Sequence, residues 1–299
     1  MRTRTLLAFT LLGFIWGTTW LAIKFVVREM PPLTAAGVRF AVAAVLLAVF
    51  AGWRGRSLGW TRLSQAERRL LLALSLLMFA VPYALIFYGE QFITSALTAI
   101  LFASAPAFTL LYDSLRVGRN LLTRERLVGL GLAFVGIVII FGPRLAGPPT
   151  ELLGALAIVA AAATSSIALV LAKHGGHSID TLVGTTWQMG LGACWLLLAA
   201  LVLERPVLKH YSAAAALGLA YLAVLGSCVT FVIFYGLLKQ MAPVQLSSLA
   251  FITPVVAVFV GWLVLDEVLG PTTLVGAVVV LAGVALLHRP VNEPVAAGD

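Results

Sequence analysis

Hydrophobic residues occur in ten long stretches along the chain, and short segments between them hold most of the polar residues. Only helices and closed barrels satisfy their backbone hydrogen bonds inside a bilayer, and a helix needs roughly 20 residues to cross it. Most stretches are near that length, and the fifth and tenth have about 16 residues each. The pattern predicts an all-α integral membrane protein with ten transmembrane helices, at about residues 5–27, 33–52, 70–89, 92–113, 127–142, 152–172, 182–203, 213–238, 244–265 and 272–287.

The composition supports a membrane location. Of the 299 residues, 61% are hydrophobic and 11% are charged, whereas about 25% of the residues of soluble domains are charged. The first stretch is too long for a secretory signal peptide and lacks a small-residue cleavage site, so we expect it to be retained as a transmembrane helix. Residues 289–299 are polar and contain prolines, and we expect a disordered cytoplasmic tail there.

Basic residues gather on alternate connecting segments. One side holds Arg2, Arg4, Arg54, Arg56, Arg62, Arg68, Arg69, Arg116, Arg119, Arg124, Arg126, Lys173, Lys239 and Arg289, and the other holds Arg28, Arg144, Arg205 and Lys209. Because cytoplasmic segments carry the excess of Lys and Arg, we expect both termini in the cytoplasm and the protein in the cytoplasmic (inner) membrane of a bacterium. This anchoring also explains the net charge of +8, and no nucleic-acid partner is expected.

The two halves of the chain share several sequence features. The tetrapeptide IFYG occurs at residues 86–89 and again at 233–236. Residues related by the same offset, or by one that differs by one or two, are Gly129 and Gly276, Gly136 and Gly283, Pro106 and Pro254, and Lys24 and Lys173. Because five helices are an odd number, two successive five-helix units cross the membrane in opposite senses, as in many secondary transporters. We therefore predict two inverted repeats, residues 1–145 and 146–288.

Three segments carry a family resemblance. They are "GFIWGTTWLAIKFVVREMPPLTAAGVRF", "TSALTAILFASAPAFTLL" and "LSSLAFITPVVAVFVGWLVLDEVLGPTTLVGAVVVLAGVALL". Together they resemble the EamA-type branch of the drug/metabolite transporter superfamily, over about residues 8 to 288. The resemblance implies ten helices, a central substrate cavity and export of amino acids or related metabolites. The acidic residue that the family carries between paired helices is Glu267 in the second unit, whereas the first unit has "RVGRN" at Arg116 to Asn120.

Aromatic and polar side chains recur along the first predicted helix. Trp16, Trp20 and Lys24 are spaced by four residues, so they lie on one stripe, with Thr19 beside it. Aromatic faces, a hydroxyl and an ammonium suit an organic solute that carries a carboxylate. We predict that this stripe faces the substrate cavity. The alternative is that Lys24 extends to the membrane interface and the rings pack in the core.

Two charged residues fall within or next to predicted helices 2 and 3. A charge inside the membrane needs a partner or water, so we expect Arg39 to face the bundle interior, with Glu90 as its counter-ion. The alternative is that Glu90 is an ordinary loop carboxylate. The related residues of the second unit are Gln188 and Leu237, so the charges occur only on the outer half of the first unit. This asymmetry predicts an outer gate or an anion-recognising vestibule.

Two prolines lie at related places in predicted helices 4 and 9. Pro106 and Pro254 each remove a backbone hydrogen bond, and corresponding helix breaks in two halves indicate a binding site in transporters. Kinks that only improve helix packing are the alternative. The predicted substrate-binding set is completed by nearby hydroxyls, by aromatic rings within the spans and by Gln188, that is, by Tyr83, Phe87, Ser104, Trp187, Gln188, Tyr235, Ser247, Ser248 and Thr253.

The sequence lacks the nucleotide-binding, metalloprotease and serine-hydrolase motifs, so we expect no enzyme activity and no cofactor. His174 and His177 are read as part of a loop rather than a metal site. We predict a secondary transporter, an exporter of small amphipathic metabolites such as amino acids, that works by alternating access. A channel, a receptor or an intramembrane enzyme are the alternatives. The expected partners are a small-molecule substrate and membrane lipid; a proton as coupling ion, and a monomer or a homodimer, are left open.

Overall fold

The hydrophobic stretches form helices in the computed structural model, which describes residues 3–117, 122–176, 178–204, 211–247 and 249–287. The described residues contain no β-strand. The α-helices are α1 (Thr3–Val27), α2 (Pro32–Trp53), α3 (Gln65–Leu74), α4 (Val81–Gly89), α5 (Ser95–Phe102), α6 (Ala105–Val117), α7 (Arg124–Phe141), α8 (Pro149–Gly175), α9 (Thr181–Leu203), α10 (Ala213–Ala223), α11 (Thr230–Leu238), α12 (Pro243–Ser247), α13 (Leu249–Leu265) and α14 (Pro271–Leu287). The predicted tail, 289–299, lies outside the described residues.

Several of these helices join into longer spans. A π-helical segment, Ser75–Ala80, links α3 to α4, and a second one, Val224–Val229, links α10 to α11. In the described part of the chain, nine helical runs are long and apolar enough to cross a membrane, and α14 is a shorter apolar helix. This confirms the predicted fold class, an all-helical membrane protein with ten helices.

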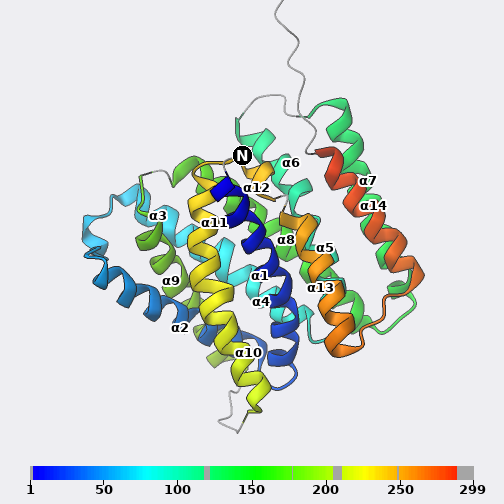
Figure 1. Ribbon diagram of the computed structural model, residues 1–299, viewed down its shortest axis with the longest axis horizontal. Coiled ribbons are helices and arrows are strands. Elements are labelled where there is room, and N and C mark those ends of the chain that lie inside the picture. The colour runs from blue at the N-terminus through cyan, green and yellow to red at the C-terminus, as the bar shows by residue number, and fades with distance from the viewer. Residues whose placement is uncertain (1–2, 118–121, 177, 205–210, 248, 288–299) are drawn as a thin grey trace, which may run out of the picture.

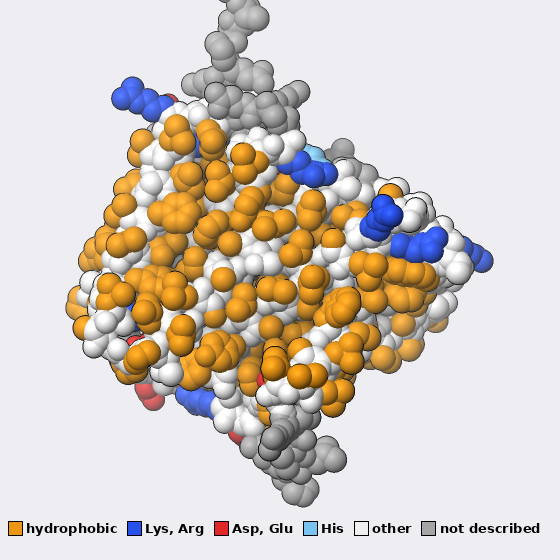
Figure 2. Space-filling view, turned by 180° about the vertical axis from the view of Figure 1, so that it is seen from behind, with side chains coloured by type: hydrophobic (Ala, Val, Ile, Leu, Met, Phe, Trp, Pro, Cys, Tyr) orange, Lys and Arg blue, Asp and Glu red, His pale blue; other side chains and the backbone are white. Residues whose placement is uncertain are grey.

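The helices stand side by side with their connections at two ends (Figure 1). The described N-terminus and the end of α14 lie at the same end, at the top of the view. We call this the basic end; it also holds the connections at residues 54–64 and 239–242. The opposite end, here the far end, holds residues 28–31, 90–94 and 266–270. Hydrophobic side chains cover the middle of the face in Figure 2, most of the visible Lys and Arg side chains lie above them, and charged side chains of both signs lie below, as expected for a belt in contact with lipid.

Glycines bring α7 and α14 into close contact at one edge of the bundle (Figure 1). A methyl group added to Gly129 would lie 2.7 Å from the carbonyl oxygen of Gly283, and one added to Gly136 would lie 2.8 Å from that of Gly276. Small residues allow such close approach of two membrane helices. The glycines therefore allow α7 and α14 to pack closely against each other within one chain.

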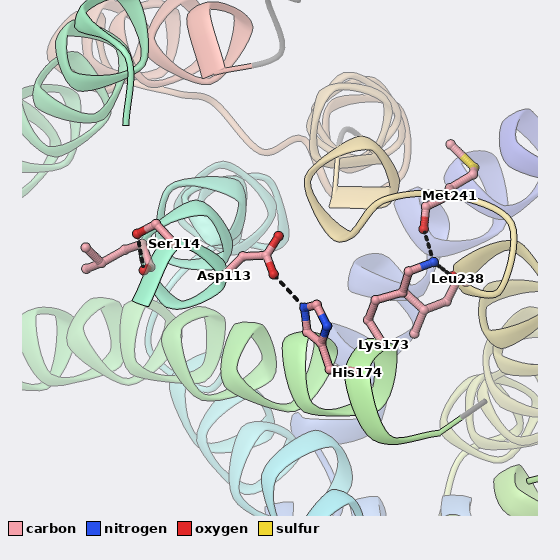
Figure 3. A network of polar contacts seen from close by, with 7 residues as sticks. Asp113, Ser114, Lys173, His174, Leu238 and Met241 are labelled. Atoms are coloured by element: carbon pink, nitrogen blue, oxygen red, sulfur yellow. Dashed lines mark hydrogen bonds and ion pairs between the residues drawn. The ribbon is translucent and has the colours of Figure 1, made fainter. Parts of the chain in front are cut away.

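A lysine contact occurs once in each half of the chain. The Lys24 Nζ on α1 donates to the carbonyl oxygens of Glu90, at 2.6 Å, and Ile93, at 2.7 Å. We call this the Lys24 clamp. At the basic end the Lys173 Nζ on α8 donates to the carbonyl oxygens of Leu238, at 2.7 Å, and Met241, at 2.8 Å (Figure 3). This is the Lys173 clamp. Each ammonium satisfies carbonyl groups that the end of a helix leaves without partners.

Carboxylates at the far end cap helix N-termini that belong to the other half of the chain. Glu204, at the end of α9, accepts hydrogen bonds from the backbone N–H groups of Leu33 and Thr34 at the start of α2. Glu267, beyond α13, accepts from the N–H groups of Ser95 and Ala96 at the start of α5. Negative charge is favourable at these positions because it compensates the partial positive charge of the N-terminus.

Candidate substrate cavity

A cavity of about 120 Å³ lies in the middle of the bundle. It is lined by side chains from both halves of the chain. Its aromatic residues are Trp16, Trp20, Tyr83, Phe102, Phe231 and Phe234, and its hydroxyl residues are Thr19, Thr109, Ser165, Ser166, Ser247 and Thr253. Its remaining residues are Ile23, Met78, Ile86, Ala105, Leu169, Leu246, Leu249 and Ala250.

Aromatic rings from α1, α5 and α11 pack against one another along this cavity. The Trp16 ring centroid lies 5.5 Å from that of Phe231 and 5.2 Å from that of Phe234. Trp20 packs at 5.4 Å against Phe102. The indole Nε1 groups of both tryptophans are buried, and neither has a hydrogen-bond partner in the described part of the chain. Because a buried donor without a partner is costly, these two groups are candidates to donate to a bound solute.

The hydroxyl groups of the cavity are held by the helix backbone. Thr19 Oγ1 donates to the Trp16 carbonyl at 2.7 Å. Ser166 Oγ on α8 contacts the carbonyls of Ala162, at 2.8 Å, and Ala105, at 2.9 Å, so it also ties α8 to the start of α6. Since each hydroxyl uses its hydrogen in these contacts, its oxygen remains able to accept. The cavity therefore offers donors on its indoles and acceptors on its hydroxyls.

Six of the predicted site residues line the cavity together: Trp16, Thr19, Trp20, Tyr83, Ser247 and Thr253. Ten others lie elsewhere: Lys24, Arg39, Phe87, Glu90, Ser104, Pro106, Trp187, Gln188, Tyr235 and Pro254. Ser248 is outside the described residues. Ile23, which the four-residue stripe on α1 does not include, also lines the cavity.

Arg39 does face the bundle interior, but the structure does not pair it with Glu90. Its guanidinium is buried, and it donates from Nε to Ser227 Oγ and from Nη2 to the Gly226 carbonyl, both at 2.8 Å. It also lies 4.8 Å from the centroid of the Tyr83 ring. The expected ion pair is therefore wrong in this conformation. The reason is that the π-helical segment Val224–Val229 presents acceptors directly to Arg39.

Lys24 and Glu90 meet at the far end, away from the central cavity. The Lys24 ammonium does not face the central cavity, since the two carbonyls of the Lys24 clamp bind it at the far end. Glu90 is fully buried, so it is not an ordinary loop carboxylate. In the described part of the chain, its carboxylate oxygens make no hydrogen bond with Arg39 or any other residue, and its backbone carbonyl oxygen is the one that accepts from Lys24.

Three predicted site residues lie near the basic end instead. The Tyr235 hydroxyl donates to Gln188 Oε1 at 2.5 Å, and both residues line a smaller cavity of about 40 Å³. The Trp187 ring packs against that of Trp60, with 4.7 Å between the ring centroids and an interplanar angle of 57°, and its Nε1 donates to the Leu58 carbonyl at 3.0 Å. Trp187 therefore anchors the connection between α2 and α3.

Of the two histidines predicted to lie in a loop, His174 lies instead in the last turn of α8, at the basic end. His174 Nε2 is 2.8 Å from Asp113 Oδ1 on α6 (Figure 3). His177 lies outside the described residues. Within the described chain, no group of three or more His, Cys, Asp or Glu side chains is arranged to hold a metal ion.

The structure does not show matching helix breaks at the two predicted prolines, Pro106 and Pro254. The span that contains Pro106 is interrupted at Ala103 and Ser104, between α5 and α6. By contrast, α13 continues through Pro254. Ser104 is buried and donates to the Leu101 carbonyl at 2.7 Å, which stabilises the turn at the interruption. A proline removes one hydrogen bond but does not by itself end a helix when packing holds the flanking turns.

Sequence reasoning missed several lining residues. Phe231 and Phe234 are three residues apart and so share a helix face, which is a signal that the sequence does carry. Ser165 and Ser166 are adjacent small polar residues in an apolar stretch, which is a weaker signal. The remaining contacts depend on which helices are neighbours, and a helical pattern alone does not reveal this.

A sequence model of the EamA-like transporter family matches residues 3–142 and again residues 152–289. "Uncharacterized transporter YoaV" from Bacillus subtilis (strain 168) is 27% identical over 271 residues, which cover 90% of this chain and 91% of the relative. "Uncharacterized inner membrane transporter YedA" from Escherichia coli (strain K12) is 30% identical over 270 residues, which cover 87% of this chain and 84% of the relative.

A solved structure has a TM-score of 0.71 with this fold at 17% identity, and the match covers 96% of this chain and 98% of that one. At this identity the likeness shows a shared fold. The helices and the sequence matches together define a multi-pass membrane transporter. The chain belongs to the EamA-like transporter family, within the drug/metabolite transporter superfamily, which confirms the resemblance found in the sequence.

Proposed function

We propose that this protein is a secondary transporter that exports small amphipathic metabolites, amino acids among them, by alternating access. The observation that carries the proposal is the central cavity, because it combines aromatic walls, two indole donors and several hydroxyls. An apolar cavity of about 150 Å³ is large enough to bind benzene. A cavity of about 120 Å³ therefore suits a solute with a small apolar body.

The cavity favours solutes with little net charge. Among its described lining residues there is no Lys, Arg, Asp or Glu. A solute with a full charge would lose its hydration there without gaining an opposite charge. We therefore favour metabolites that pair an aromatic or aliphatic body with a few hydrogen-bonding groups. Among amino acids we favour those with zero net charge over singly charged anions, because their two opposite charges attract each other and partly offset the lost hydration.

The two lysine clamps support alternating access between two inverted five-helix units, residues 1–145 and 146–288. They join related segments, yet one lies at the far end and the other at the basic end. In an inverted-repeat transporter, related contacts at opposite ends close the two sides in turn. We propose that the Lys24 clamp closes the far end and that the Lys173 clamp closes the basic end.

Truncating a cavity tryptophan is expected to weaken solute binding. Trp20→Ala removes an aromatic wall and an indole donor from the cavity, so we expect the KM for solute exchange to rise about tenfold or more, because aromatic contacts and a hydrogen bond are each worth about 1 kcal/mol. The measurement is uptake by proteoliposomes loaded with a panel of unlabelled amino acids and assayed with the labelled ones.

Trp262→Ala is the matched control, because Trp262 is 58% exposed on the outer face of α13. Its KM should equal that of the unmodified protein. Equal KM values for the Trp20→Ala and Trp262→Ala proteins would contradict a binding role for the cavity. Absence of saturable exchange of any solute by the unmodified protein would argue against a transporter of this substrate class.

The orientation is tested by cysteine labelling in cells after Cys194→Ala, since Cys228 is buried. A cysteine at Arg56, which is exposed at the basic end, should react only with reagents that enter the cytoplasm. A cysteine at Gly147, exposed at the far end, should react with a membrane-impermeant maleimide added outside. Reaction of both positions from the same side would refute the proposed inversion of the two units.

A further inference from the structure

Glu90 is a buried carboxylate that does not line the central cavity. It directly follows α4, and its side chain has no exposed surface. Neither of its carboxylate oxygens has a hydrogen-bond partner in the described part of the chain. An ionised carboxylate in this setting would lack both water and donors, so burial favours the form that carries a proton.

The nearest ammonium binds the backbone of Glu90 rather than its carboxylate. Lys24 Nζ donates to the Glu90 carbonyl oxygen and to the Ile93 carbonyl oxygen. A carboxylate with a negative charge would compete with these two neutral carbonyls for the same ammonium, because a hydrogen bond between two ions is the stronger one. The Lys24 clamp is therefore the arrangement that accompanies an uncharged Glu90.

Charged groups reach Glu90 from several neighbouring elements. Lys24 on α1, Arg39 on α2 and Glu267 beyond α13 are close enough to act on its charge. On α8, which packs against the end of α4, Glu151 lies one turn before Gly154, the glycine that contacts Gly89. Arg144 lines, together with Lys24 and Glu151, a cavity of about 210 Å³ beside the clamp. Three cations and two carboxylates therefore lie around the site, and among the described residues only the Lys24 ammonium is bonded to Glu90 itself.

The second half of the chain provides an internal comparison. In the Lys173 clamp the residue whose carbonyl takes the place of that of Glu90 is Leu238. The geometry of the clamp is the same, with both bonds of each lysine between 2.6 and 2.8 Å. A carboxylate is therefore not required to build such a clamp. The two clamps are similar, and the Lys24 clamp differs from the Lys173 clamp in having a carboxyl group, that of Glu90, next to it.

We infer that Glu90 is a proton-binding site that controls the Lys24 clamp and couples transport to protons. This inference rests on the proposed transport function. With the proton bound, Lys24 holds α1 against the turn after α4 and the far end is closed. When the proton leaves to water, the carboxylate needs either water or the Lys24 ammonium, and both outcomes weaken the clamp. Ile86, one turn before Glu90, lines the central cavity, so Glu90 lies about one helical turn along the chain from the solute site.

This arrangement exchanges a solute for a proton. A proton taken up from the far side by Glu90 closes that side once the solute has left. The proton is released through the central cavity when the basic end is open, and a new solute then enters. One proton enters the cell for each solute that leaves, and no other reactant is needed.

The closed state of the far end is tested with spin labels at Arg28 and Gln91, which are both exposed and lie on the two segments that Lys24 joins. The protein is reconstituted in lipid nanodiscs after Cys194→Ala, and the distance between the labels is measured by pulsed electron resonance. Raising the pH should increase the population with the longer distance, by up to about tenfold per pH unit when one proton is linked.

Two variants of Glu90 distinguish an effect of proton binding from an effect of side-chain packing. Glu90→Gln keeps the shape, and Glu90→Leu reproduces the residue of the Lys173 clamp, so both should hold the short distance at every pH. Glu151→Gln, which removes another carboxylate at the far end, should keep the pH response. A response that persists in both Glu90 variants, or no response in the unmodified protein, would overturn the inference.

Transport assays distinguish this proposal from the proposed function. If proteoliposomes exchange solute and an imposed pH gradient drives its accumulation in the unmodified protein but not in Glu90→Gln, both are supported. If the proteoliposomes exchange solute but a pH gradient does not change this exchange, the proposed proton site is overturned and the proposed transport function stands. If the unmodified protein exchanges no solute but the distance between its spin labels still depends on pH, the proposed function is refuted instead.

Discussion

Replacing Gly136 by leucine is expected to prevent recovery of the folded protein. A Cβ atom at this position would lie 2.6 Å from the Val280 backbone nitrogen and 2.8 Å from the Gly276 carbonyl oxygen. Because both are backbone atoms, α14 has to move away from α7 along its length. We expect a loss of about 3 kcal/mol or more in stability, seen as aggregation or an early thermal transition in size-exclusion and fluorescence assays in detergent.

Gly131→Leu is the matched control, since it lies on the same helix and a Cβ atom there meets nothing within 4 Å. It adds the same side chain and the same helix propensity but faces outward. Its elution profile and transition temperature should match those of the unmodified protein. If both leucine variants behave alike, the glycine contact between α7 and α14 does not determine the stability of this edge.

The helices of this protein were predictable because the thickness of the bilayer sets the length of each hydrophobic stretch. The stretch predicted at 33–52 is the helix Pro32–Trp53, and the one at 182–203 is the helix Thr181–Leu203. The glycine contact was predictable for a similar reason, because the spacing of Gly129 and Gly136 places them on one face of one helix. Such features depend on a single segment and its period.

The partners of the buried charges were not predictable in the same way. Depth in the membrane placed Arg39 and Glu90 at a similar level, and opposite charge then suggested a pair. The structure assigns Arg39 to the backbone and hydroxyl of a π-helical segment, a local distortion that no period in the sequence reveals. The identity of a helix neighbour depends on the packing of the whole bundle, and this information is absent from any one span.

The residues predicted to line the cavity include both correct and incorrect predictions. The stripe of Trp16, Thr19 and Trp20 was predicted from its spacing, and these residues do line the cavity. Lys24 follows the same spacing, yet its long side chain reaches carbonyls at the far end. A four-residue period specifies a helix face only approximately, and a flexible side chain of four methylenes extends beyond the position of its own Cα atom.

Arg39→Ala is expected to destabilise the protein by about 3 kcal/mol or more, because it empties a fully buried site and leaves the Gly226 carbonyl without its donor. Ser227→Ala should cost less, about 1 to 3 kcal/mol, by leaving the Arg39 Nε–H without an acceptor. Arg28→Ala is the control, since Arg28 is exposed, and its transition temperature should not change.

Double substitutions then identify the partner of Arg39. Because Arg39 and Ser227 share a hydrogen bond, the pair Arg39→Ala with Ser227→Ala should cost clearly less than the sum of the two single changes. Arg39→Ala with Glu90→Gln should be close to additive, and exchanging the charges of the two residues should rescue nothing. Thermal unfolding in detergent gives all of these values. Recovery of stability by the charge exchange would show that Arg39 and Glu90 do pair, in a conformation other than the one described.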